Sequence, residues 1–575
     1  MISFLKQQWR LMVVAVFLLM LCSVLVVRML KIQVLDVEGG SEFLQYQGDV
    51  RTIRNVTVPA HRGMITDRNG QPLAVSTPVL SVWLNPQHFQ GSANDVLKLS
   101  KALGVSHNKL KDKLERYKNK QFVYLKRHMS PEKAAQVFAL GLRGVYSKKE
   151  YQRFYPAGEV AAHLVGYVNI DSFGQEGFEY SYDSWLQGEP GSKQVVKDLY
   201  QRTIKNVKQI KAPKMGKDLA LSIDLRLQFI AYKALKEAVS YHRADAGSVV
   251  VLDVETGEVL AMANQPAFNP NDRSKIDINA VRNRAVTDVF EPGSTMKPIT
   301  MMAALESGKY DINSQINTSP GYVKIGRKTF LDPVNYGTID LRKVLAKSSQ
   351  VGTVKIATTL KQEELYGAFY RLGIGQYLGT GFPGESTGYL PNKSNWKPVE
   401  QAAMGFGAGV SVTALQLAHS YSIFANKGIK KPVSLMRVDN KDDVLSELVI
   451  EKSIATDVSE MLAAVTSKMG TAAKANTQYY NVAGKTGTSH KVGQGGYQSG
   501  SYMSFFAGYA PQENPKIVTV VVVDDPKGRE YYGGEVAAPV FSQVVADSLR
   551  VLGVTPDKLS PLALSYASQQ EGVNL

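Results

Sequence analysis

The stretch EPGSTMKP at residues 291–298 decides how this chain is organised. Its Pro-Gly pair predicts a turn, and the apolar run at 299–305 predicts a buried helix directly after it. If Ser294 lies in the first helical turn, Lys297 lies three residues further on and on the same face. A hydroxyl group then stands beside an amine, which is the pairing of a nucleophile with a possible base.

The spacing Ser-x-x-Lys is weak on its own. It recurs at 106–109, 130–133 and 394–397, where a surface serine near a surface lysine is the simpler interpretation. A chemical role for Ser294 therefore depends on further motifs in the right order.

Two such motifs follow. KSSQ at 347–350 comes at the end of a helix predicted over 341–346, and GKTGTS occupies 484–489. The order Ser-x-x-Lys, then Ser-Ser-amide, then Lys-Thr-Gly is the signature of penicillin-binding proteins and class A β-lactamases. The three motifs together are strong support, although each is weak alone.

The chemistry of acyl transfer explains these residue types. Ser294 would attack a peptide carbonyl, and Lys297 would take its proton. A free lysine is protonated near neutral pH, with a pKa of about 10.4. We therefore expect burial and a neighbouring cation, Lys485, to lower the pKa of Lys297. Ser348 could relay a proton between the two lysines and the leaving amine.

The third motif is predicted to form a strand edge that binds substrate. Lys485 and the hydroxyl of Thr486 or Thr488 can bind a carboxylate, and Gly487 lets a peptide lie close to the strand. Backbone N–H groups of Ser294 and Thr488 would hold the oxyanion.

Composition and charge narrow the function. The chain has 575 residues, which predicts several domains. Cys22 is its one cysteine, so neither an intramolecular disulfide nor a Cys/His metal cluster is expected, and we predict no cofactor. The net charge of +16 could favour nucleic acid, anionic lipid or wall polymer. Without a nucleic-acid motif, we predict no nucleic-acid partner and a generally basic, solvated surface.

Residues 11–27 form an apolar run interrupted only by the mildly polar Cys22 and Ser23. Its length is at the short end of the roughly 17–25 residues that a membrane helix needs. Basic residues flank it on both sides and orient it only weakly. A cleaved signal peptide is the alternative, but no small-x-small cleavage site follows. We favour an uncleaved anchor, with everything after it across the membrane.

The remaining chain divides into three parts in this interpretation. Residues 41–215 form a mixed α/β region without a catalytic constellation. Lysines recurring every third residue from 205 to 217 suggest a solvated linker, with a basic binding face as the alternative. From 216 to 560 we expect one α/β domain. Its early hairpin (248–263) and late β-branched strand (517–523) predict a sheet that joins both ends of the domain. Residues 561–575 look like a loose tail, and 1–40 hold the anchor.

The chain resembles the class B penicillin-binding proteins, and among them the division-specific type, penicillin-binding protein 3. The likeness covers nearly the whole length. It is carried by RMLKIQ at 28–33, RG at 62–63 with DRNG at 67–70, GQEG at 174–177 with Glu179, EPGSTMK at 291–297, KTGT at 485–488 and YGGEVAAPVF at 532–541.

The resemblance implies a single transmembrane helix, an elongated mixed pedestal domain in place of a glycosyltransferase domain, and a penicillin-binding domain with a mostly antiparallel sheet flanked by helices. It implies a D,D-transpeptidase that cross-links peptidoglycan at the division septum. A stem peptide ending in D-Ala-D-Ala would acylate Ser294, and an amine of a neighbouring stem would resolve the ester. The resemblance also implies covalent inhibition by β-lactams.

The location and partners follow from the same resemblance. It implies a bacterial inner-membrane protein with a cytoplasmic N-terminus and a periplasmic catalytic domain. The implied partners are a septal glycan polymerase and other division proteins.

One residue departs from the family pattern. The second motif normally reads Ser-x-Asn, and Gln350 takes the place of the Asn. Gln keeps the amide donors and acceptor but adds a methylene. We expect activity to be retained with an altered β-lactam or substrate preference, or with a mild loss of acylation rate.

Two other functions stay open at this stage. A D,D-carboxypeptidase or β-lactamase would resolve the acyl-enzyme with water, and neither needs so large a pedestal. A membrane-anchored scaffold or β-lactam sensor would have lost catalysis, with Gln350 as its mark. Intact Ser294, Lys297, Ser348 and Lys485 argue against such a loss.

Overall fold

A computed structural model describes residues 2–33, 41–198, 203–274, 276–493 and 496–558. It divides into two compact units, which are described separately here. Unit 1 comprises residues 1–61, 78–152 and 187–216, and unit 2 comprises 62–77, 153–186 and 217–575.

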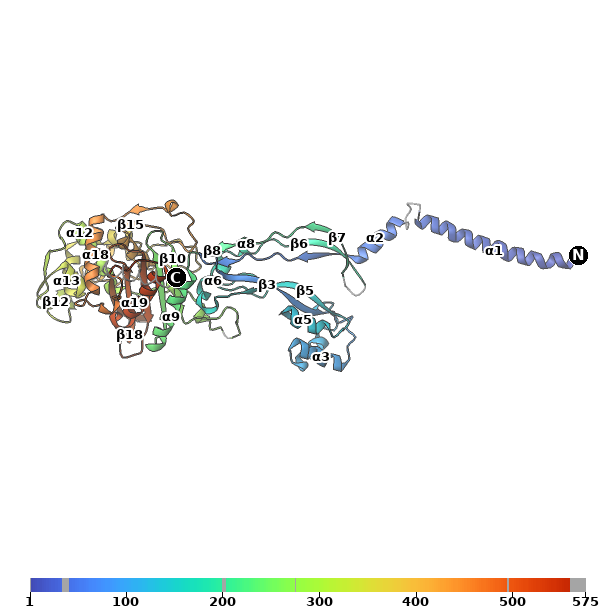
Figure 1. Ribbon diagram of the computed structural model, residues 1–575, viewed down its shortest axis with the longest axis horizontal. Coiled ribbons are helices and arrows are strands. Elements are labelled where there is room, and N and C mark those ends of the chain that lie inside the picture. The colour runs from blue at the N-terminus through green and yellow to red at the C-terminus, as the bar shows by residue number, and fades with distance from the viewer. Residues whose placement is uncertain (1, 34–40, 199–202, 275, 494–495, 559–575) are drawn as a thin grey trace, which may run out of the picture. The chain divides into compact units, whose positions relative to one another are not determined.

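Unit 1 begins with the apolar helix α1 (Ile2–Gln33), labelled in Figure 1. Its segment Gln8–Lys31 is 24 residues long with a mean hydropathy of 2.8, and none of it is buried by other parts of the protein. At about 1.5 Å per residue the segment exceeds the roughly 30 Å of a bilayer core. Helix α1 is therefore long and apolar enough to be the predicted membrane anchor. Helix α2 (Ser41–Thr52) follows.

A three-stranded antiparallel sheet forms the next part of unit 1. It has the order β1 (Ile53–Val58), β6 (Gly191–Lys197), β7 (Thr203–Lys211). Strand β7 contains Lys205, Lys208 and Lys211 and is exposed along its whole length. The prediction of a solvated linker was therefore wrong for this stretch, because its backbone pairs with β6.

A small α/β layer completes unit 1. The end of β3 (Pro72–Leu84) pairs with β4 (Val123–Met129). The helices α3 (Ala93–Leu103), α4 (His107–Arg116) and α5 (Pro131–Phe138) surround a core that includes Val82, Leu99 and Val137. Ser106 and Ser130 are the N-cap residues of α4 and α5. These two Ser-x-x-Lys matches thus mark helix starts.

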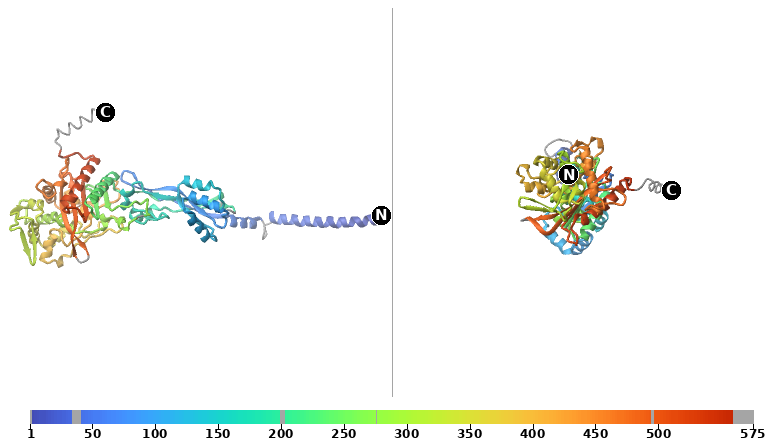
Figure 2. Two further views of the ribbon diagram at one scale, coloured as in Figure 1. Left: turned by 90° about the horizontal axis from the view of Figure 1, so that it is seen from below. Right: turned by 90° about the vertical axis from the view of Figure 1, so that its left-hand side faces the viewer.

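Unit 2 is built on a five-stranded antiparallel sheet in the order β10-β9-β19-β18-β17. The hairpin β9 (Ala246–Asp253) and β10 (Val259–Gln265) comes early in the chain. Strands β17 (Ala483–Gly493), β18 (Gly496–Ala510) and β19 (Ile517–Asp524) come late. Because β19 pairs with β9, the sheet joins both ends of the domain, as predicted. Figure 2 shows the late strands in orange and red beside the green early segment.

Helices cover both faces of this sheet. Phe506 of β18 packs against Phe541 of α19 (Gly533–Val551), which lies beside α9 (Leu225–Tyr241). The neighbouring Phe505 points to the opposite face and contacts Phe290. On that second face lie α17 (Ala414–Ala425) and the helices that carry the first two motifs.

The remaining elements of unit 2 surround the sheet. They are β2 (Ile65–Thr66), α6 (Ala162–Val165), α7 (Gly177–Ser181), α8 (Asp183–Leu186), β8 (Leu219–Ala220), α10 (Ile278–Val281), α11 (Arg284–Thr287), α12 (Lys297–Glu306), β11 (Gln315–Asn317), β12 (Tyr322–Ile325), β13 (Lys328–Leu331), β14 (Thr338–Asp340), α13 (Leu341–Ala346), α14 (Gln350–Thr359), α15 (Gln362–Arg371), α16 (Pro398–Met404), β15 (Ile429–Lys430), β16 (Glu447–Leu448) and α18 (Lys452–Thr466).

Two arginines and two carboxylates from separate segments form a buried ion-pair network within unit 2. Glu179 is fully buried and accepts from Arg62 Nε at 2.7 Å and from Arg153 Nε at 2.6 Å. Arg62 Nη1 also donates to Asp183 at 2.7 Å. Removing one partner of such a buried network leaves an uncompensated charge. These residues have a structural role.

Candidate active site

The three motifs meet at one cleft of unit 2. A cavity of about 970 Å³ is lined by Ser294, Lys297, Ser348, Gln350 and the segment 486–488. Seven of the eight predicted site residues thus line one cavity. The eighth, Lys485, is wholly buried directly beside it on β17.

Ser294 lies in a single 3₁₀ turn, Gly293–Met296, immediately before α12. Two hydrogen bonds hold this turn: Thr295 Oγ1 donates to the Pro292 carbonyl at 2.6 Å, and Tyr421 from α17 donates to the Thr295 carbonyl at 2.8 Å. Gly293 has a φ of +50°, which glycine adopts without strain. The Pro-Gly turn therefore delivers the serine to the helix start, as the sequence predicts.

Lys297 is connected to Ser294 through Ser348. Lys297 Nζ donates to Ser348 Oγ at 3.0 Å and to the Ser348 carbonyl at 2.5 Å, and Ser348 Oγ lies 3.2 Å from Ser294 Oγ. Burial lowers the pKa of Lys297 to about 7, while the charge of Asp332 opposes this shift. At neutral pH a large fraction of Lys297 is thus free to accept a proton.

Lys485 is a second buried amine beside the cleft. Its Nζ lies 3.2 Å from the Thr486 carbonyl and 3.3 Å from Thr486 Oγ1. Burial, and then repulsion by Lys297, lowers the pKa of Lys485 well below its usual range. We predicted that burial and Lys485 together would lower the pKa of Lys297. Burial does lower it, whereas the repulsion between the two amines lowers the pKa of Lys485 instead.

Ser348 has a left-handed backbone conformation, with a φ of +55°. This conformation is unfavourable for a residue with a Cβ and persists only where its surroundings hold it. Here Lys297 holds the carbonyl and hydroxyl of Ser348. The strained residue thus lies at the point where the first two motifs meet.

Asp332 is a site residue that the sequence interpretation missed. Its carboxylate accepts from Ser349 Oγ at 2.5 Å and from the backbone N–H groups of Gln350 and Val351 at 2.6 and 3.1 Å. It therefore anchors the start of α14 and, with it, the second motif. No local pattern around Asp332 distinguishes it from other loop aspartates.

Gln350 is the first residue of α14 and lines the cleft. The Gln350 N–H donates to Asp332, which holds the backbone in place. The extra methylene therefore carries the side-chain amide further from the backbone than an Asn side chain would. The side chain is partly exposed beside Ser348.

The two threonine hydroxyls of the third motif have different neighbours. Thr486 Oγ1 lies 3.2 Å from Thr471 Oγ1, close to the Lys485 amine. Thr488 Oγ1 accepts from the Gly533 N–H at 2.9 Å. A Cβ at Gly487 would lie 1.8 Å from the ring of Phe505, so this position requires glycine for packing within the sheet.

Known proteins are similar to this chain over most of its length. The family model of the penicillin-binding protein transpeptidase domain matches residues 247–546, and that of the penicillin-binding protein dimerisation domain matches 57–221. The chain is 43% identical over 518 residues to the probable peptidoglycan D,D-transpeptidase PbpC of Pseudomonas aeruginosa, covering 90% of this chain and 91% of the relative. It is 40% identical over 557 residues to the peptidoglycan D,D-transpeptidase FtsI of Escherichia coli K12, covering 96% of this chain and 93% of the relative.

The fold of the chain is also similar to solved structures of penicillin-binding proteins. The apo transpeptidase domain of Burkholderia pseudomallei penicillin-binding protein 3 is 39% identical, with a TM-score of 0.55, and covers 59% of this chain and 98% of that one. Mycobacterium tuberculosis penicillin-binding protein 3, complexed with aztreonam, is 26% identical with a TM-score of 0.66, and covers 87% of this chain and 98% of that one. The chain belongs to the class B penicillin-binding proteins, the family that carries a dimerisation domain and a penicillin-binding transpeptidase domain.

Proposed function

We propose that this chain is a peptidoglycan D,D-transpeptidase that cross-links stem peptides at the division septum through an ester on Ser294. The hydrogen-bonded series Lys297–Ser348–Ser294 carries the proposal, because it connects a nucleophile to a buried amine with a pKa near 7. The named relatives support the reaction class.

The acylation step uses the three side chains in turn. Ser294 Oγ attacks the carbonyl carbon of the penultimate D-Ala while its proton passes through Ser348 to Lys297. Backbone N–H groups of Ser294 and Thr488 stabilise the oxyanion. When the C–N bond breaks, the departing D-Ala nitrogen takes up the proton and leaves the acyl group on Ser294.

The substrate carboxylate binds to the third motif. Lys485, Thr486 and Thr488 supply an amine and two hydroxyls beside the cleft, and binding of an anion offsets the repulsion between the two buried lysines. A β-lactam carries the same kind of carboxylate and would acylate Ser294 in the same way. Gln350 would donate to the substrate amide.

Helix α1 supports a membrane setting for the reaction. In this proposal α1 crosses the inner membrane once, with a cytoplasmic N-terminus and the catalytic unit in the periplasm. Residues 1–40 are the anchor region, 41–215 the non-catalytic pedestal and 216–560 the catalytic domain. Residues 561–575, which the sequence predicts to be a tail, lie outside the described residues. A septal glycan polymerase and other division proteins are the partners.

Product analysis of the full-length chain in detergent tests the function. With stem peptides that end in D-Ala-D-Ala, we expect both free D-Ala and a cross-linked peptide dimer. Free D-Ala without dimer would instead indicate a D,D-carboxypeptidase. Absence of any acylation in a folded protein would indicate a scaffold.

The rate of acylation is expected to rise with pH through a midpoint near 7, because only neutral Lys297 accepts the serine proton. Below the midpoint the rate should fall by about tenfold per pH unit. Intact-mass measurement of the penicillin adduct at several pH values checks this. A flat profile across neutral pH would show that Lys297 does not titrate as the base.

Replacing Gln350 by Asn is expected to change the order of preference among β-lactams, by about threefold to tenfold in acylation rate, because one amide hydrogen bond is repositioned. Acylation rates for several β-lactams measure the effect. Equal rates in the variant and the wild type for every β-lactam would contradict the role of side-chain length.

A further inference from the structure

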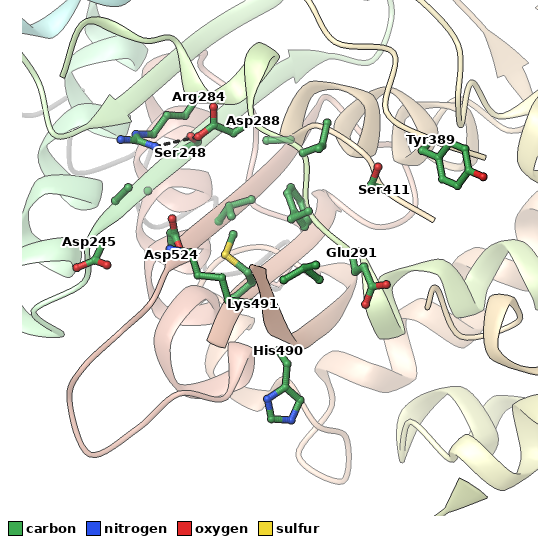
Figure 3. Close-up of a pocket in the computed structure, with 18 of the residues that line it drawn as sticks. Asp245, Ser248, Arg284, Asp288, Glu291, Tyr389, Ser411, His490, Lys491 and Asp524 are labelled. Carbon is green, nitrogen blue, oxygen red and sulfur yellow. Dashed lines mark hydrogen bonds and ion pairs between the residues drawn. The ribbon is translucent and has the colours of Figure 1, made fainter. Parts of the chain in front are cut away.

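A second cavity lies at one end of the unit 2 sheet (Figure 3). Its volume is about 730 Å³, within the range of ligand pockets. Its floor includes the apolar residues Val522 of β19 and Met503 of β18 and the polar Ser248 of β9. Charged side chains from other segments surround this floor.

The second cavity adjoins the catalytic cleft. Glu291 and His490 line both cavities. Glu291 precedes Ser294 by three residues, and His490 follows the third motif on β17. A ligand in the second cavity would therefore lie next to the cleft that contains Ser294.

One group of side chains on the far side of the cavity from the cleft carries excess positive charge. Arg282 and Arg284 share Asp288 at 2.9 and 2.8 Å, and Figure 3 shows the Arg284–Asp288 ion pair apart from Glu291. The nearby pair Lys491–Asp524, at 2.7 Å, is neutral as a whole. Asp245 also lines the cavity and pairs with Lys527 outside it, so the excess positive charge is confined to the two arginines that share Asp288. Arg284 Nε is buried, and no described residue accepts its hydrogen bond.

The side next to the cleft carries an uncompensated negative charge. The described residues that donate to the Glu291 carboxylate are neutral: it accepts from the Gly409 N–H at 3.0 Å and from the Tyr497 hydroxyl at 2.9 Å. No cation pairs with Glu291 among the described residues. Burial, and then the hydrogen bond and charge of Glu291, raises the pKa of Tyr497 to about 12.

We propose that this cavity binds the acceptor stem peptide, through a residue that carries both an amine and a free carboxylate. The ammonium form approaches Glu291 at the border of the cleft, and the carboxylate lies toward Arg282 and Arg284. The negative Glu291 would thus meet the ammonium of such a residue, and the positive arginines would meet its carboxylate, so the charges of the cavity and the ligand are complementary. This inference rests on the proposed transpeptidase function, which requires a second substrate.

The resolving step then follows from this placement. The acceptor ammonium first loses one proton to solvent water, and the neutral amine then attacks the carbonyl carbon of the Ser294 ester. The C–N bond forms and the C–Oγ bond breaks. The second amine proton passes through Lys297 and Ser348 to Ser294 Oγ, which restores the free serine. Glu291 is a positioning residue in this step.

The test measures how one acyl-enzyme divides between aminolysis and hydrolysis. The full-length chain is acylated by a D-alanyl thioester donor and offered D-alanine or D-alaninamide, which lacks the free carboxylate. The ratio of amide product to hydrolysed product does not depend on the rate of acylation. Comparison of each variant with the wild type cancels the different reactivities of the two amines.

Glu291→Gln and Arg282→Gln should give different results. Glu291→Gln removes the charge that attracts the amine, so the product ratio should fall about tenfold for both acceptors. Arg282→Gln removes one carboxylate partner, so the ratio should fall by about fivefold or more for D-alanine and stay unchanged for D-alaninamide. Arg437→Gln is the matched control, because Arg437 pairs with Asp439 outside the cavity.

Two results would overturn the acceptor site. One is an unchanged product ratio in Glu291→Gln, and the other is an equal fall for both acceptors in Arg282→Gln. Both leave acylation, and with it the proposed function, intact. Failure of the wild-type chain to be acylated by the donor would instead overturn the proposed function, and the acceptor site with it.

Discussion

Replacing Ser294 by alanine is expected to abolish the covalent penicillin adduct, with a loss of acylation on the order of a million-fold. No other hydroxyl of the described residues occupies the same position: Ser348 Oγ lies 3.2 Å away and is held by Lys297. Alanine fits the turn, because the hydrogen bonds that shape it come from Thr295 and Tyr421. Intact mass of the full-length chain, with and without penicillin, measures the effect.

Ser130→Ala provides a matched control for Ser294→Ala. Ser130 has the same Ser-x-x-Lys spacing, but it caps helix α5 in unit 1. Its loss should cost about 1 kcal/mol of stability and leave the adduct intact. An adduct that persists in Ser294→Ala would assign the nucleophile to another residue. A transient adduct in the wild type, with release of hydrolysed drug, would favour a β-lactamase-like enzyme.

Replacing Lys297 by methionine is expected to lower the acylation rate by about 10²–10⁴-fold without unfolding the protein. The side chain is only 2% exposed, and burial already lowers its pKa to about 7. Methionine keeps most of the buried volume and removes a polar group that is costly to desolvate. The rate of adduct formation and the thermal midpoint, measured on the same sample, separate catalysis from stability.

Lys133→Met is the control for Lys297→Met. Lys133 completes the Ser-x-x-Lys match of α5 and is exposed, so its loss should change neither rate nor stability. A Lys297→Met variant that is acylated at the wild-type rate would exclude Lys297 as the base. In that case Lys485, the other buried amine beside the cleft, would be the next residue to replace.

The sequence predicted the parts of the site that sit on strong local patterns. The helix expected at 341–346 has those bounds, and the early hairpin and late β-branched strand pair in one sheet. These predictions of local structure were correct because turn residues and apolar runs determine where a helix begins and where a strand runs.

Other features depend on contacts that sequence patterns do not encode. Asp332 reaches the second motif only because the intervening chain folds back, and it holds three groups there. Strand β7 looked like a linker because both of its faces are exposed, so it shows no hydrophobic alternation. The charge pattern of the second cavity combines Arg282, Glu291 and Lys491, which are unremarkable singly.

The strand order of unit 2 also governs when the enzyme can first work. The ribosome makes strand β9 more than two hundred residues before strand β19. In the sheet, β19 pairs with β9 and connects it to β18 and β17, which border the cleft. Until β19 is synthesised, β9 has an open edge and β17 has no connection to the early hairpin. During synthesis, Ser294 is therefore present long before strand β17, which carries the third motif, is held in the sheet. A chain cut short before residue 517 would be an aggregation-prone fragment, not a weak enzyme.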